Sequence, residues 1–94
     1  MTNQEIKNII LSAIKDYFEI NGIKENASDD TVLFGINSSF DSLGFVNIIV
    51  DIENRLKEEQ YDVTLTSEKA MSRKNSPFKS VQSLADFIEE TIGK

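Results

Sequence analysis

The chain of 94 residues contains no cysteine, no histidine and no tryptophan, and only one proline. Without cysteine there is no disulfide framework, no thiol nucleophile and none of the thiolate ligands that structural zinc sites use. Without histidine the usual general base for a serine nucleophile is missing, which disfavours a small hydrolase. Apolar packing must therefore hold the fold together, and catalytic chemistry has few residues to draw on.

Membrane-targeting features and an excess of positive charge are also absent. No apolar run is long enough to cross a bilayer, and the amino terminus lacks the basic region of a secretory signal. The formal net charge is −6, whereas phosphate backbones and anionic membranes attract basic proteins. We therefore expect a cytoplasmic protein that binds neither nucleic acid nor membranes.

The composition that remains is typical of a folded domain. Apolar residues make up 39% of the chain and include six Phe and two Tyr. The length suits one domain, residues 1–94, with a single small core. We expect a compact monomer.

Helical periodicity is clear in the first segment, residues 3–20, where apolar residues recur at steps of three and four. Thr2 and Glu5 have the spacing of a capping box at its start. At its end, Asn21 and Gly22 form a left-handed terminator.

Residues 42–58 form a second helix that is apolar on two faces, at 100° per residue. The first face contains Phe45, Ile48, Ile49, Ile52 and Leu56. The second face is a strip of Leu43, Val46 and Val50. In a small domain the first face packs into the core, while the strip is either covered by loops or offered to another protein.

The remaining segments complete a small all-α bundle of three to four helices. Residues 21–41 predict a long loop held to the core by Val32, Leu33, Phe34 and Ile36, and residues 61–65 an extended loop. Residues 66–71 suggest one helical turn, and residues 72–79 a polar linker. Ser80 is the expected cap of a last helix, residues 80–92.

The turn that opens the second helix, Ser38-Ser39-Phe40-Asp41-Ser42-Leu43-Gly44-Phe45, concentrates polar groups before an apolar run. Ser42 stands where unpaired N–H groups and the helix dipole stabilise a negative charge, which suits an attached phosphate. The structural alternative is that Asp41, Ser42 or Ser39 only caps the helix. Gly44 either leaves room beside an attached group or is simply tolerated in a first turn.

The segment from Asp41 to Glu53 resembles the phosphopantetheine attachment region of acyl and peptidyl carrier proteins, in which Asp-Ser-Leu opens the second helix. The order of helices and loops is similar over essentially the whole chain. The resemblance implies an all-α bundle of the acyl-carrier-protein type.

By this resemblance, Ser42 carries a 4'-phosphopantetheine arm that a phosphopantetheinyl transferase attaches from coenzyme A, and Asp41 serves recognition by that transferase. The arm holds an acyl or aminoacyl substrate as a thioester. The chain is then a stand-alone carrier without catalytic residues or a metal site. Leu43, Val46, Val50 and Glu53 are the implied contacts with partners, which include a loading ligase and downstream acyl-processing enzymes, as in fatty acid, lipid or polyketide biosynthesis.

Several positions depart from the family pattern. Gly44, Asn47 and Asn54 stand where many carriers of fatty acid synthesis have carboxylates, and the loop before Asp41 is longer. These departures favour a specialised biosynthetic pathway. Ser38 and Ser39 are rival modification sites, but neither is followed by Leu-Gly and an apolar helix. The alternative function is a helical protein interaction module without a prosthetic group, which binds a partner through the same strip.

Overall fold

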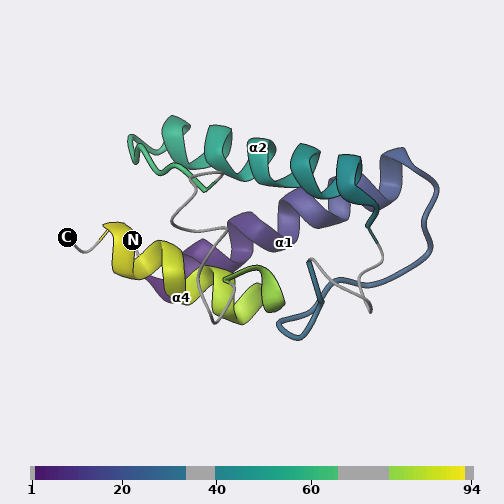
Figure 1. Ribbon diagram of the computed structural model, residues 1–94, viewed down its shortest axis with the longest axis horizontal. Coiled ribbons are helices and arrows are strands. Elements are labelled where there is room, and N and C mark those ends of the chain that lie inside the picture. The colour runs from purple at the N-terminus through teal and green to yellow at the C-terminus, as the bar shows by residue number, and fades with distance from the viewer. Residues whose placement is uncertain (1, 34–39, 66–76, 93–94) are drawn as a thin grey trace.

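The computed structural model describes residues 2–33, 40–65 and 77–92, without the side chains of Ser42 and Pro77 (Figure 1). All regular secondary structure among the described residues is helical, and these residues form no strand, which agrees with a small helical bundle. The elements are α1 (Asn3–Ile20), α2 (Ser42–Glu58), the single 3-10 turn η1 (Pro77–Lys79) and α4 (Val81–Ile92). The turn predicted at residues 66–71 lies outside the described residues.

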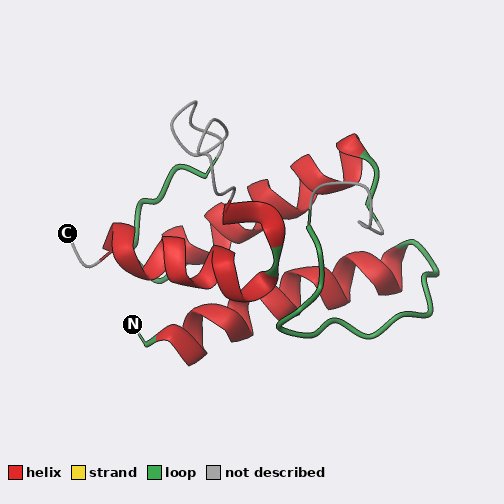
Figure 2. Ribbon diagram, turned by 60° about the horizontal axis from the view of Figure 1, so that its bottom comes forward, coloured by secondary structure: helices red, strands yellow, loops and turns green. Residues whose placement is uncertain are grey.

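Both α2 and α4 run antiparallel to α1, and the start of α1 lies at the same end of the molecule as the end of α4 (Figures 1 and 2). Helix α1 packs against both α2 and α4. No helix among the residues described combines the length and apolarity needed to span a membrane.

Helix α1 begins and ends with the devices that its sequence predicts. The Oγ1 atom of Thr2 accepts the backbone N–H of Glu5 at 3.2 Å, while Oε1 of Glu5 accepts the N–H of Thr2 at 3.1 Å. At the other end, Gly22 adopts a φ of +66°, and the N–H of Ile23 donates to the carbonyl of Phe18 at 2.8 Å. This is a Schellman ending, which satisfies carbonyls that the helix leaves unpaired.

Helix α2 uses similar devices with different residues. Asp41 is its N-cap, since Oδ1 accepts the N–H of Gly44 at 2.6 Å. Its C-terminal end is again of the Schellman type, because the N–H of Tyr61 donates to the carbonyl of Leu56 at 2.9 Å. Here Gln60 takes the left-handed position, with a φ of +69°, although glycine is the residue best suited to it.

The start of α4 is capped twice. Ser80 is its cap, as predicted, because its Oγ accepts the N–H of Ser83 at 3.2 Å. The next two N–H groups, of Val81 and Gln82, donate to the carbonyls of Thr31 and Asp29 in the long loop. The loop between α1 and α2 is thereby fixed to the beginning of α4.

One core joins the three helices and the described parts of the loops. It contains Ile6, Ile10, Ala13, Ile14, Phe18, Leu33, Phe40, Phe45, Ile48, Ile49, Ile52, Leu56, Val63, Leu65, Phe78, Val81, Leu84, Ala85 and Ile88. The predicted core face of α2 is fully included, and so is the predicted apolar anchor Leu33 of the long loop. Of the other expected anchors, Val32 is only half-buried and does not belong to this core, while Phe34 and Ile36 lie outside the described residues.

The prediction of a polar linker before α4 was wrong at Phe78, and residues 72–76 of that linker lie outside the described residues. Residues 72–79 were expected to be a polar linker, yet Phe78 is almost completely buried and packs edge-on against Phe45, with ring centroids 5.0 Å apart. A single aromatic residue in a polar run has no periodicity, so no pattern of residues indicated that Phe78 belongs to the core. Phe78 anchors the chain to α2 immediately before α4 begins.

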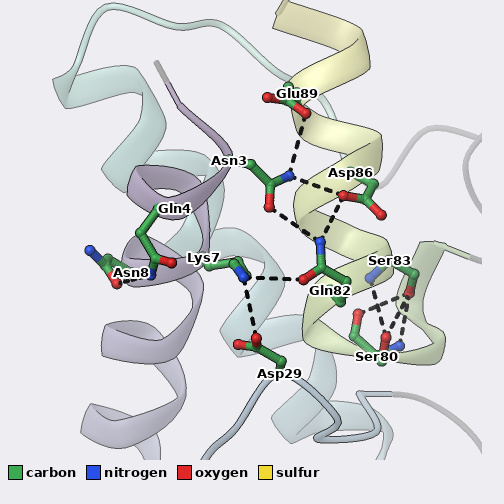
Figure 3. A network of polar contacts seen from close by, with 10 residues as sticks. All are labelled: Asn3, Gln4, Lys7, Asn8, Asp29, Ser80, Gln82, Ser83, Asp86 and Glu89. Carbon is green, nitrogen blue, oxygen red and sulfur yellow. Dashed lines mark hydrogen bonds and ion pairs between the residues drawn. The ribbon is translucent and has the colours of Figure 1, made fainter.

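The seam between α1 and α4 is lined by polar side chains that bind one another (Figure 3). Gln82 on α4 donates to Oδ1 of Asn3 at 3.2 Å, and Asn3 donates to Oδ1 of Asp86 at 3.0 Å. Lys7 donates to both Asp29 and Gln82 at 3.2 Å. The side chain of Lys7 is only 15% exposed, so this network closes the seam and holds the long loop against it.

Candidate functional site

The site that the sequence points to is the beginning of α2. Asp41, which is exposed, has an extended backbone and caps the helix, and Ser42 is the first helical residue. Of the three predicted capping candidates, the capping contact seen here belongs to Asp41. Capping therefore explains why an aspartate stands at position 41. It does not explain why a serine follows at position 42, at the positive end of the helix dipole.

The apolar strip on α2 is exposed. Leu43, Val46 and Val50 have exposed fractions of 69%, 46% and 45%, whereas every residue of the core face is 5% exposed or less. These exposed fractions favour a strip that is offered to another protein over a strip that neighbouring loops cover. Exposed apolar side chains gathered on one face are typical of a binding surface.

Glu53, the predicted acidic partner contact, has a structural task as well. Its Oε2 atom accepts the backbone N–H of Leu65 at 3.3 Å, and the side chain is half-buried. Glu53 therefore holds the extended segment after α2 against the helix. This carboxylate is less available to a partner than the sequence suggested.

Gly44 has a role that neither sequence interpretation identified. A Cβ atom at this position would lie 2.8 Å from Cζ of Tyr17 and closer still to its hydroxyl oxygen. The Tyr17 ring is held in place by Phe40, at a centroid distance of 5.4 Å, and by Phe18 at 6.4 Å. Glycine thus lets the tyrosine of α1 lie directly against the first turn of α2.

A groove of about 430 Å³ opens between α1 and α2 beside this contact. It is lined by Ala13, Asp16, Tyr17, Ile20, Asn21, Asp41, Leu43, Gly44, Asn47, Ile48 and Asp51. The α2 side of the groove includes Asp41 and Leu43, the neighbours of Ser42 in the sequence. The sequence did not indicate the α1 side, because Ile20 follows Tyr17 by three residues and Ala13 by seven and so continues the apolar spacing of its helix.

Arg55 forms ion pairs with two of the aspartates that line the groove. Its Nη2 donates to Oδ2 of Asp16 at 2.6 Å, and its Nε lies 3.2 Å from Oδ2 of Asp51, an ion pair without hydrogen-bond alignment. Contacts with Asp51 and then Asp16 raise the pKa of Arg55. These ion pairs join α1 to α2, and they leave both aspartates about half exposed.

Comparisons with protein-family models, curated proteins and solved structures give no match. Among the residues described here, no group of three or more Asp or Glu side chains is placed to hold a metal ion. The function therefore rests on the geometry of the site and on the resemblance of residues 41–53 to carrier proteins.

Proposed function

We propose that this chain is a carrier protein that holds an acyl or aminoacyl group as a thioester on a 4'-phosphopantetheine arm attached to Ser42. The observation that carries the proposal is the position of Ser42, the first residue of α2, between an exposed capping aspartate and an exposed apolar strip. The family resemblance of residues 41–53 gives this position its chemical meaning.

The residues at the start of α2 fit a covalently attached phosphodiester. The N-terminal N–H groups and the dipole of the 17-residue helix favour a negative charge there. No acidic residue stands in the first turn to oppose it. Asp41 adds one exposed carboxylate just outside the helix, where a modifying enzyme and its metal ion can engage it.

The chain itself provides the attachment site and a surface on which partner enzymes dock. The arm supplies the thiol that a cysteine-free protein lacks. The Leu43, Val46 and Val50 strip offers a small apolar contact to successive enzymes. Because a carrier must leave each enzyme after delivery, these contacts are weak and short-lived. A modest exposed strip suits this task better than a large apolar interface does.

The proposal of a specialised pathway comes from finer features of α2. Gly44, Asn47 and Asn54 leave α2 less acidic than the helix of carriers in fatty acid synthesis, so we place this chain in a specialised pathway, such as the assembly of a surface polysaccharide, a lipid or a secondary metabolite. The predicted cytoplasmic location and monomeric state belong to the same proposal.

The second candidate is a helical interaction module without a prosthetic group. The exposed strip alone favours it, because an amphipathic partner helix could cover Leu43, Val46 and Val50 permanently. This alternative gives Ser42 no role beyond the first turn of α2.

Intact mass spectrometry separates the two candidates. The protein is incubated with coenzyme A and a broad-specificity phosphopantetheinyl transferase, and its mass is measured before and after. We expect the wild type to gain one phosphopantetheinyl group and Ser42→Ala to gain none. Ser38→Ala and Ser39→Ala are the matched controls and retain the modification. An unchanged wild-type mass contradicts the carrier proposal.

A second substitution separates the two tasks of Asp41. Asparagine caps helices as well as aspartate does, so Asp41→Asn preserves the capping geometry while removing the charge. We expect this variant to unfold at the wild-type denaturant concentration but to be modified more slowly at Ser42. A wild-type rate of modification would mean that Asp41 serves the helix only.

A further inference from the structure

The groove between α1 and α2 has exposed apolar rims on both helices. Ile20, at the end of α1, is 83% exposed, and Leu43 on α2 is 69% exposed. Both line the groove, and the side chains of Ala13 and Ile48 contribute further apolar surface to its walls. An isoleucine this exposed adds almost nothing to the stability of the helix that bears it, but it gains free energy when a partner covers it.

The polar part of the groove is acidic. Asp16, Asp41 and Asp51 line it, and none of the described residues that line it is a lysine or an arginine. Arg55 pairs with Asp16 and Asp51 from outside the lining, and a single guanidinium leaves an excess of negative charge beside three carboxylates. A partner that enters the groove therefore encounters apolar walls and unbalanced carboxylates together.

We propose that this groove receives a basic and apolar segment of the enzyme that modifies Ser42, with an apolar side chain between Ile20 and Leu43 and a lysine or arginine facing the carboxylates. The inference rests on the proposed function. Charge complementarity selects the occupant, because the groove is acidic within a chain of net charge −6. Its α2 rim includes the residues on both sides of Ser42, so an enzyme that reaches Ser42 covers it.

This assignment gives α1 a part in recognition that the resemblance to carriers did not imply. The implied contacts all belong to α2, whereas Asp16 and Ile20 come from the last turns of α1 and Asn21 is its C-cap. The ring of Tyr17 against Gly44 keeps the two helix ends together at this point. Partner recognition thus depends on how α1 and α2 are joined.

The steady-state kinetics of Ser42 modification test the inference, with the same transferase and coenzyme A as above. For Ile20→Ser we expect kcat/KM to fall about fivefold to tenfold, mainly through KM, and Ile20→Leu to restore most of the loss. Substitution of an exposed residue in a last turn leaves the unfolding midpoint nearly unchanged, and urea titration of each variant checks this.

A matched pair of lysine substitutions tests the charge. Asn47 lines the groove, while Asn54 lies two turns further along the same helix, is also exposed and does not line the groove. Both variants change the net charge by +1. We expect Asn47→Lys to raise KM about fivefold at low salt, with the difference shrinking as salt is added, and Asn54→Lys to have little effect.

The outcomes are distinct. If the wild type is modified and Ile20→Ser and Asn47→Lys both keep its kcat/KM, the groove inference is overturned while the carrier proposal stands. If the wild type is not modified, the carrier proposal and the groove inference are both contradicted. If sedimentation shows a wild-type dimer that Ile20→Ser dissociates, the groove binds a second copy of the chain, and the inference is again overturned.

Discussion

The two long helices, α1 with 18 residues and α2 with 17, are built alike at their ends but differ in where they place their apolar residues. Helix α1 buries Ile6, Ile10, Ala13, Ile14 and Phe18 and exposes one large apolar residue, Ile20, at its end. Helix α2 buries five apolar residues and exposes three more along its length. The exposed residues of α2 do not serve the core, so binding is the better explanation for their presence.

The largest expected effect separates the two faces of α2. Ile52 is fully buried and Val50 is 45% exposed. We expect Ile52→Ala to lower the free energy of unfolding by about 2–5 kcal/mol, because it leaves a cavity. Val50→Ala should cost less than about 0.5 kcal/mol. Urea unfolding measures both, and comparable losses would mean that the strip is part of the core.

A smaller effect is expected where the two helices touch. Gly44→Ala should lower the free energy of unfolding by about 1–2 kcal/mol through overpacking against Tyr17, although alanine is the better helix former. Adding Tyr17→Leu should relieve the clash, so the double variant loses less than the two single losses combined. An alanine variant more stable than the wild type would show that the tyrosine ring is free to move away.

Much of this architecture was predictable because the signals were periodic or local. The capping box at Thr2, the terminator at Gly22 and the core face of α2 each follow from residue spacing alone. The burial of Phe78, the contact between Gly44 and Tyr17 and the groove beside Ile20 were not predictable. They depend on which segments meet in three dimensions, and nothing in the local spacing of these residues specifies that.

The C-terminal ends of the two helices offer a matched comparison. Gly22 and Gln60 occupy the same left-handed position, where a side chain costs about 1 kcal/mol or more. A Cβ on Gly22 meets nothing within 4 Å, so Gly22→Ala tests backbone strain alone and should destabilise by about 1 kcal/mol. Gln60→Gly should stabilise by about 0.5–1 kcal/mol, after the entropy of glycine is counted. Thermal and urea unfolding check both signs.

The smallest effect concerns acid sensitivity at the helix starts. The hydrogen bonds from Thr2, chiefly from its backbone N–H, lower the pKa of Glu5 below 4.5. A lowered folded-state pKa means that this contribution is present above about pH 4.5 and is lost as pH falls through the folded pKa. We expect wild type and Glu5→Gln to differ most near neutral pH and to converge in acid. Helix α2, with Gly44 at the corresponding position, has no such carboxylate.

The central claim is that the hydroxyl of Ser42 is the point of attachment. After incubation with coenzyme A and a phosphopantetheinyl transferase, fragmentation mass spectrometry of the proteolysed chain locates the added group. The account predicts one phosphopantetheinyl group, on Ser42 alone. A group on Ser38 or Ser39, or no group on any residue, would contradict it.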